Sequence, residues 1–210
     1  MFTTLPFPSP LEIPFQRFEW RNIDNVAGFS YMGRLKFAEL YKLMQGSNFL
    51  AGYEKIYLHG TSGSGKSHIL AALVCRLICE RKRVVYIPDC SLLLADFTLV
   101  IRSALRFAFY DSEPHLTFLE SADKEDLFTF CAGQTDVYFV VDQLNALELG
   151  GRNAYLDDVK KDVMGYLLKM KLGHKYIFSA SASEQSNREY NLKQSGITVI
   201  PINGGLTEVS

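Results

Sequence analysis

The segment G-T-S-G-S-G-K-S at residues 60–67 constrains the fold of this chain more than any other feature. It fits the spacing G-x-x-x-x-G-K-S, in which glycines let the backbone curl so that its amides point toward an anion. A short apolar segment at 55–59 precedes it, and a largely apolar helix from residue 66 to about 81 is expected to follow. Strand, loop and helix in this order predict the phosphate-binding loop (Walker A motif) of nucleotide-binding proteins, and a chance glycine-serine turn is much less consistent with that context.

The positions of this loop have separate tasks at a triphosphate. Lys66 offers a mobile cation to the β- and γ-phosphates, and the Ser67 hydroxyl is suited to ligate Mg²⁺. The loop therefore predicts a magnesium-nucleotide cofactor, with ATP and GTP both open at this point. The residues expected to surround the nucleotide are Gly60, Thr61, Ser62, Gly63, Ser64, Gly65, Lys66, Ser67 and His68.

An acidic partner for the loop is expected at Asp142, which follows the apolar segment 137–141. A carboxylate at a strand end can hold magnesium through its water shell, as in the Walker B motif. A strand-end aspartate is also a common cap or turn residue, and its pairing with the loop favours the metal role. Many such ATPases carry glutamate next, but here it is Gln143, whose amide cannot accept a proton at neutral pH. We expect Gln143 to orient the attacking water, and hydrolysis to be slow.

Ser179 completes the expected catalytic set of Lys66, Asp142, Gln143 and Ser179. It ends the predicted strand 176–178, where related ATPases place a polar sensor of the γ-phosphate, and a small-residue turn at 179–183 explains it equally well. Two arginines, Arg152 and Arg188, follow the third and fourth strands and are candidates to neutralise phosphate charge. Ordinary surface arginines are the simpler interpretation of both.

Alternating strands and helices predict an α/β fold: a three-layer P-loop NTPase with a mainly parallel five-stranded sheet. Because one strand and two helical stretches lie between the loop and Asp142, the acidic strand is not expected to follow the loop strand directly. This favours the strand order 5-1-4-3-2. Strands are expected at 55–59, 83–88, 137–141, 176–178 and 197–200, and helices at 35–45, 66–81, 91–110, 123–132 and 156–172, with Glu113-Pro114 as a break.

The 210 residues are enough for one α/β domain of this size. Residues 1–30 are rich in proline and aromatic residues without periodicity, which predicts an extended N-terminal arm. Residues 31–206 are expected to form the P-loop NTPase domain and residues 207–210 a C-terminal tail. A helical lid after the fifth strand is not visible, so a lid subdomain is expected to be absent.

Charge and hydropathy restrict the partners only in part. The formal net charge of -1 gives no overall attraction to nucleic acid or anionic membranes. With no apolar stretch long enough to span a bilayer and no visible signal peptide, an intracellular protein without membrane contact is expected, in cytoplasm or nucleus. A nucleic-acid partner is weakly indicated by Arg76, Arg81, Lys82 and Arg83, for which a solvated helix end is the commoner explanation. A protein partner or an oligomer also stays open.

Three segments together, 58–68, 84–90 and 141–147, resemble the ATPase domain of crinkler-type proteins and of retrotransposon hot spot proteins. The resemblance extends over about 32–206. It implies an ASCE-type ATPase of the AAA or STAND kind, with ATP preferred over GTP. Such domains are usually joined to a nuclease-like or kinase-like domain, and some members are secreted effectors that act in a host nucleus.

The function expected from the sequence is magnesium-dependent binding and hydrolysis of ATP by a P-loop ATPase module of a crinkler-like protein. One alternative is a nucleotide-dependent switch with little turnover, which Gln143 and the missing lid favour. Another is a small-molecule kinase, which would need an acceptor pocket and an arginine-bearing lid that the sequence does not reveal. Phosphorylated product would distinguish the kinase from the other two.

Overall fold

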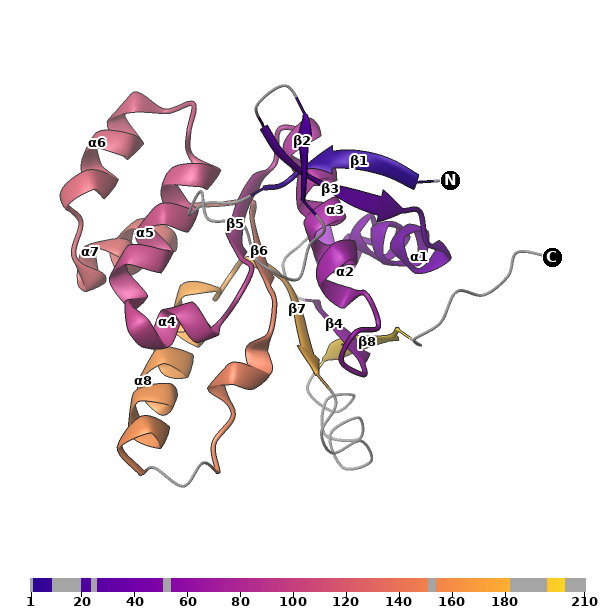
Figure 1. Cartoon of the computed structure of the whole chain (residues 1–210). Helices are drawn as coiled ribbons and strands as arrows, with labels where there is room; N and C mark the ends of the chain where they lie inside the picture. Colours follow the sequence, from indigo (N-terminus) through magenta and orange to yellow (C-terminus); the bar gives the residue numbers. More distant parts are fainter. Residues whose placement is uncertain are drawn as a thin grey trace.

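A parallel five-stranded sheet forms the centre of the molecule in the computed structural model, which describes residues 2–8, 20–23, 26–50, 54–150, 154–181 and 196–202 (Figure 1). The strands pair in the order β5-β6-β7-β4-β8, all parallel. Counted from the strand before the loop, this is the predicted order 5-1-4-3-2, which is confirmed. The strands are β4 (Lys55–Gly60), β5 (Arg83–Ile87), β6 (Val137–Val141), β7 (Lys175–Ser181) and β8 (Ile197–Pro201).

Helices cover both faces of this sheet, which gives the expected three layers (Figure 1). On one face lie α1 (Leu35–Met44) and α3 (Lys66–Cys79), with the short α2 (Ser47–Leu50) beside α1. The helices on the other face are α4 (Ser91–Ala95), α5 (Phe97–Ala108), α6 (Glu113–Ser121), α7 (Lys124–Ala132) and α8 (Ala154–Met170). A 3-10 turn, η1 (Leu144–Leu147), follows β6.

The apolar character of β6 follows from its position between these layers. All five of its residues are buried. Val137, Phe139 and Val141 face the core under α5, α7 and α8. The alternate residues Tyr138 and Val140 face the core under α1 and α3. Because both faces of a covered parallel strand are dry, such a strand is an almost continuous apolar run rather than an alternating one.

A second sheet, which the sequence analysis did not anticipate, lies near the N-terminus. Its strands β1 (Phe2–Pro6), β2 (Trp20–Ile23) and β3 (Val26–Met32) pair antiparallel in the order β1-β3-β2. Phe29 and Tyr31, two residues apart and so on one face of β3, are buried in a cluster that also holds Ala71 and Ala72 of α3. The expected extended arm is thus replaced by a sheet packed on the loop helix, while the boundaries 1–30, 31–206 and 207–210 remain predictions.

Three expectations concerned helix ends, and the structure differs from two of them. The expected break at Glu113-Pro114 is wrong, because these residues begin α6, where proline in the first turn lacks only an N–H that has no helical partner. The helix expected over 91–110 is divided at Asp96, whose side chain caps α5 by accepting the Leu99 N–H. The cap expected at Asp123 is confirmed by its bonds in α7.

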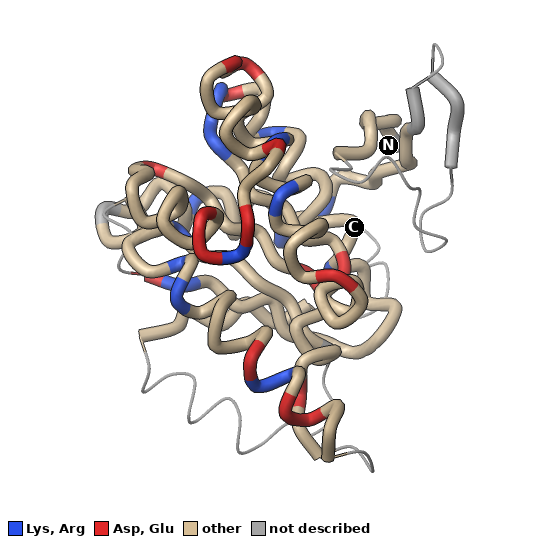
Figure 2. The backbone as a smooth tube through the Cα atoms, turned by 90° about the vertical axis from the view of Figure 1, so that its left-hand side faces the viewer, with Lys and Arg blue, Asp and Glu red and all other residues tan. Residues whose placement is uncertain are grey.

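Acidic and basic residues are interspersed along the helices seen in Figure 2, and the formal net charge is -1. This face therefore presents no broad field of one sign. Among the described helices, none combines the length and the apolar character that a bilayer crossing requires.

Candidate functional site: a glycine-rich loop beside a buried aspartate

The loop connects β4 to α3 at the carboxyl edge of the sheet. Gly60 ends β4, and Gly65 precedes the first turn of α3 with a φ of 90°. The apex, Thr61 to Gly63, is exposed, whereas Ser64 is buried. The first amides of a helix have no acceptor within the helix, so the start of α3 is suited to bind an anion.

The last strand fixes the beginning of the loop. The Ile202 N–H donates to the His59 carbonyl at 2.6 Å. A Cβ added to Gly60 would lie 2.3 Å from the Ile202 carbonyl oxygen and 2.9 Å from the Ser64 Oγ. Only glycine allows this close approach, so the first glycine of the motif is required by packing as well as by loop curvature.

Lys66, buried at 7% exposure, folds over the loop that precedes it. Its Nζ donates to the carbonyls of Gly60 and Thr61, both at 2.7 Å. Burial lowers the pKa of the Lys66 ammonium, while the negative charge of Asp142 acts in the opposite direction. The cation is therefore held at the mouth of the loop and within the electrostatic influence of the acidic residue.

Asp142, 1% exposed, leaves β6 at the same edge of the sheet. Its amide donates to the Ile87 carbonyl at 2.8 Å, which continues the pairing of β6 with β5. Ser179 of β7 is also 1% exposed, and its hydroxyl donates a hydrogen bond to the Asp142 Oδ1. Because β7 lies between β4 and β6, Ser179 stands between the loop strand and the acidic strand. β7 extends to Ser181, so Ser179 lies inside the strand and neither at its end nor in a turn that begins there, as the sequence suggested. Its sensor role remains a prediction.

Gln143 has a left-handed backbone, with a φ of 58° and a ψ of 42°. Its N–H donates to the Asp142 Oδ1 at 2.9 Å. Residues other than glycine, asparagine and aspartate seldom adopt this conformation, and those that do cluster at functional sites. The turn places Gln143, half-buried, directly beside the carboxylate.

One residue at the loop was not predicted as part of the site. Arg34, immediately before α1, donates from Nη1 to the Ser64 carbonyl at 2.6 Å. Its guanidinium covers Gly65 so closely that a Cβ there would lie 2.8 Å from three of its atoms. Arg34 lies 30 residues before Ser64 in the chain, and no local pattern links the two. Its position two residues after β3 becomes a signal only once that strand is known.

Of the remaining predicted residues, some lie near the loop and others fall outside the described residues. Ser67 is half-buried in the first turn of α3, and the His68 ring lies edge-on to Phe29, with centroids 6.1 Å apart. Arg152 and Arg188 lie outside the described residues. The structure thus brings the loop, Lys66, Asp142, Gln143 and Ser179 to one edge of the sheet, and leaves the two arginines untested.

The donor groups at this edge suit magnesium. Mg²⁺ prefers oxygen ligands, retains several waters and typically takes only one or two protein carboxylates. Asp142 provides a buried carboxylate and Ser67 a hydroxyl. Within the described ranges, no group of three or more His, Cys, Asp or Glu side chains is arranged to hold a metal by protein ligands alone. This set fits a magnesium ion that is shared with a nucleotide.

The strand order, the loop after the first core strand and the acidic residue two strands away are those of the ASCE class of P-loop folds. No protein-family model and no curated protein match the chain. Solved structures with similarity include a DNA replication initiation factor, at 16% identity and a TM-score of 0.43, covering 82% of this chain and 47% of that one. Another is AMPPCP-bound DnaA from Aquifex aeolicus, at 19% identity and a TM-score of 0.42, covering 85% and 48%.

The chain spans about half the length of each of these two proteins. With TM-scores below 0.5, neither similarity bears on what this chain binds or does. The assignment to the P-loop fold depends on the strand order and on the loop geometry described above.

Proposed function

We propose that this chain binds ATP with magnesium at the loop and hydrolyses it. The observation that carries the proposal is the convergence of Lys66 and the buried Asp142 at one edge of a 5-1-4-3-2 sheet, with Lys66 under the electrostatic influence of Asp142. A cation aimed at the phosphates and a carboxylate for the metal are the two charges that phosphoryl chemistry needs.

In this proposal the loop amides and the first turn of α3 hold the phosphates, and Lys66 exchanges its loop carbonyls for phosphate oxygens. Ser67 and Asp142 hold the metal, which supplies positive charge to the β- and γ-phosphate oxygens when bound. Ser179 fixes Asp142 Oδ1 and is the candidate sensor of the γ-phosphate. Gln143 orients the attacking water, whose proton passes to the phosphate because an amide is not a base.

Arg34 has a positioning role in the proposed site. Its bond to the Ser64 carbonyl fixes that oxygen and, in this proposal, leaves the neighbouring amides to bind the phosphates. A charge-assisted hydrogen bond of this kind contributes more than a neutral one. The role acts through the loop and requires no direct contact with the nucleotide.

A nucleotide-dependent switch with little turnover is the second candidate, and Gln143 favours it. General acid–base catalysis contributes about 10²- to 10⁴-fold in enzymes that have a positioned base. With an amide after Asp142, that contribution is missing from this position. The two candidates share the binding site and differ only in the rate of phosphate release.

Phosphate release from Mg-ATP separates these candidates when the wild type is compared with Asp142→Asn and Gln143→Glu. Hydrolysis predicts steady turnover in the wild type, a loss of tenfold or more in Asp142→Asn, and faster turnover in Gln143→Glu, by about tenfold. Asparagine keeps the shape of Asp142 and can still accept from Ser179, so the fold should survive. Binding without turnover in the wild type would support the switch, and phosphate transferred to an added acceptor would support the kinase.

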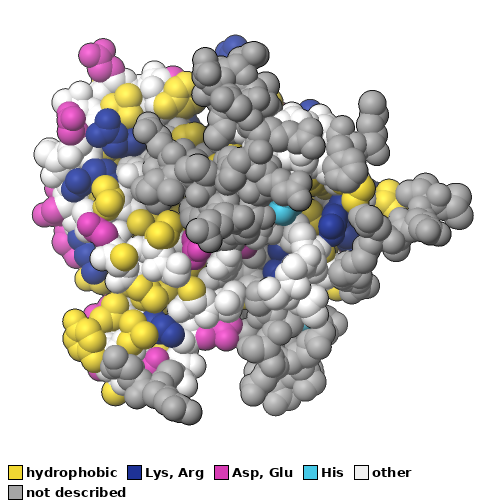
Figure 3. Space-filling view, viewed as in Figure 1, with side chains coloured by type: hydrophobic (Ala, Val, Ile, Leu, Met, Phe, Trp, Pro, Cys, Tyr) yellow, Lys and Arg dark blue, Asp and Glu magenta, His cyan; other side chains and the backbone are white. Residues whose placement is uncertain are grey.

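Further proposals rest on the sequence resemblance to crinkler-type proteins or on exposed apolar residues of the surface. The crinkler-like identity, the preference for ATP and the compartment, whether cytoplasm, nucleus or a host cell, rest on sequence alone. Figure 3 shows apolar side chains gathered at lower left, and large exposed apolar residues near the start of α8 include Leu149, Tyr155 and Leu156. Exposed apolar groups of this kind are suited to a protein partner or an oligomer contact.

A further inference from the structure

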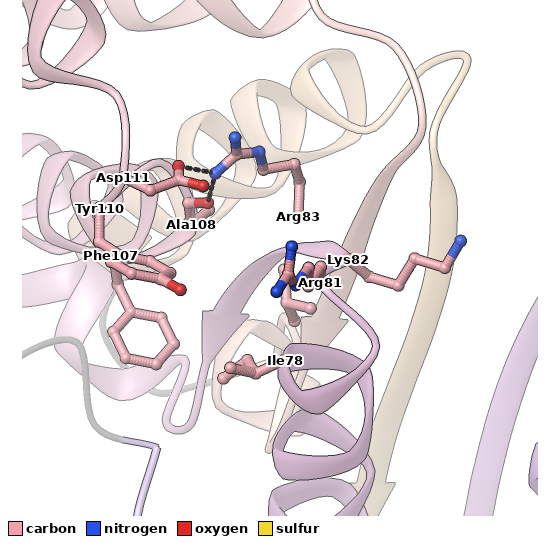
Figure 4. A pocket seen from close by; sticks show the side chains of 9 residues that line it. Ile78, Arg81, Lys82, Arg83, Phe107, Ala108, Tyr110 and Asp111 are labelled. Atoms are coloured by element: carbon pink, nitrogen blue, oxygen red, sulfur yellow. Dashed lines mark hydrogen bonds and ion pairs between the residues drawn. The ribbon is translucent and has the colours of Figure 1, made fainter.

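The amino edge of the sheet, opposite the phosphate loop, carries a cavity of about 520 Å³. It lies between the end of α3, the start of β5 and the end of α5 (Figure 4). Three cationic residues, Arg81, Lys82 and Arg83, and a single carboxylate, Asp111, line it. A volume in this range is that of pockets which hold small organic ligands.

Aromatic and basic groups face each other across this cavity. In Figure 4, Phe107 and Tyr110 stand on one side, with Ile78 and Arg81 opposite them. Tyr110 is 68% exposed, which is high for an aromatic side chain at the end of a packed helix. A flat ring could stack on Tyr110 while an attached anion meets the arginine.

The cations of the cavity differ in how they are engaged. Arg83 is bound to Asp111 and to the Ala108 carbonyl, and its hydrogen bond holds the pKa of the Asp111 carboxyl below its usual range. The side chains of Arg81 and Lys82 form no hydrogen bond and no ion pair with any residue that the structure describes. Two positive charges are therefore available to an anion, and the carboxylate that lines the cavity, Asp111, is already paired with Arg83.

Arg81 also occupies the position after a helix end at which glycine is usually found. After α3, the Arg81 N–H bonds the Ile78 carbonyl at 2.8 Å and the Lys82 N–H bonds the Leu77 carbonyl at 3.0 Å, which is the Schellman pattern. The residue at the position of Arg81 has a φ of 58°, where glycine is strongly favoured. An arginine in a conformation that suits glycine costs some stability, which is consistent with a role of its side chain beyond folding.

We propose that this aromatic and basic pocket binds one nucleotide unit of single-stranded nucleic acid, with the base stacked on Tyr110 and a backbone phosphate on Arg81. Bases in a duplex are stacked on each other and cannot stack on Tyr110 in this pocket, so the base that binds here must belong to a single strand or a free nucleotide. A single strand is favoured over a free mononucleotide because Lys82 points away from the aromatic pair in Figure 4. That direction suits the next phosphate of a continuing strand.

The test is fluorescence anisotropy with labelled twelve-nucleotide oligo-dT and oligo-U at low salt. The wild type should bind at least one of them with a Kd between about 1 and 100 µM. Tyr110→Ala and Arg81→Gly should each weaken binding about fivefold or more, since base stacking and a phosphate contact are lost. The control Tyr155→Ala removes another highly exposed tyrosine, on α8, and should leave binding unchanged.

A thermal melt of Arg81→Gly separates a binding role from a folding role. Glycine suits the φ of 58°, so Tm should be equal to or higher than that of the wild type, by about 1–3 °C, while affinity falls. Lys66→Ala, which disables the proposed triphosphate site, should bind the oligonucleotides as the wild type does. A chain that does not bind ATP can therefore still show whether the pocket at the amino edge binds the oligonucleotides.

Three results would overturn the proposal. They are no binding of either oligonucleotide, binding that neither Tyr110→Ala nor Arg81→Gly weakens, and binding of dTMP or UMP to the Lys66→Ala chain as tightly as the twelve-mers. The last result would identify a free mononucleotide as the occupant of the pocket.

Discussion

Arg34 is the residue at which the N-terminal sheet and the phosphate loop meet. It lies two residues after the end of β3, and its guanidinium holds the Ser64 carbonyl at 2.6 Å. Removing it leaves a loop carbonyl free to turn inward, toward the phosphates, which would weaken the anion site. In a loop this short, a change in the direction of one peptide dipole also changes the direction of its neighbours.

We therefore predict that Arg34→Ala weakens ATP binding about tenfold, or about 1.4 kcal/mol, as expected for a lost charge-assisted hydrogen bond. Arg34→Lys should recover part of the affinity because it keeps one donor and the charge. Arg102→Ala is the matched control, since Arg102 also bonds a backbone carbonyl, that of Ala122, but far from the loop. Titration calorimetry measures all four chains. Equal losses in the Arg34 and Arg102 variants would contradict the role.

Lys171 gives a pH prediction at the same scale. It is 8% exposed, with its ammonium 3.6 Å from the centroid of the Tyr176 ring, and burial followed by the charge of Lys55 lowers its pKa to about 7. Because the folded pKa lies below the unfolded one, the unfolded chain binds more protons between about pH 7 and 10.5. The free energy of unfolding should therefore rise with pH across this window.

Lys171→Met should be more stable than the wild type at pH 6.5, by roughly 1–3 kcal/mol, and this advantage should be smaller at pH 9. Urea unfolding at both pH values measures it. Lys169→Met, two residues away and exposed, provides the control. A wild-type stability that does not change between these pH values would show that Lys171 is not buried as described.

At the scale of helices and strands, much of the fold could be predicted because its signals are local. The strand β6 was expected at 137–141 and has those bounds, since five consecutive apolar residues report burial on both faces. The Asp123 cap was expected for a similar reason. The α6 helix was missed because Pro114 was interpreted as a helix breaker, although proline is also common in the first helical turn.

The capping box of α7 offers a test at this scale. Asp123 accepts hydrogen bonds at 2.9 Å from the amides of Glu125 and Asp126. Asp123→Ala should lower the free energy of unfolding by about 1 kcal/mol, or Tm by about 2–4 °C, without changing ATP affinity. Asp158→Ala removes only an exposed pair with Lys161 and should change Tm by much less. Thermal melts of the three chains would decide this.

At the scale of the whole molecule, long-range contacts limited what could be predicted. The loop and Asp142 were identified because each follows a recognisable strand, and Ser179 because it lies near the carboxyl end of another; parallel strands bring their carboxyl ends to one edge. The N-terminal sheet was missed because its pairing, such as Phe2 with Met32, joins distant segments that lack helical or strand periodicity. Arg34 was missed for the same reason, since its role depends on a contact made across the fold.

The layered arrangement separates two surfaces of the sheet. The carboxyl edge carries the proposed ATP site and the amino edge the proposed nucleic-acid pocket. The helix α3 joins them, because its first turn begins at Lys66 and its last residues lead into Arg81. A rigid helix that touches both places is a direct physical connection between them.

The central claim is that the loop binds Mg-ATP, and its most direct test is titration calorimetry of ATP into the wild type and into Lys66→Ala, with Lys161→Ala as an exposed-lysine control. We expect magnesium-dependent binding by the wild type and the control, weakened about tenfold or more in Lys66→Ala because a buried cation aimed at the phosphates is lost. Equal affinity in all three chains, or no binding by the wild type, would contradict the account.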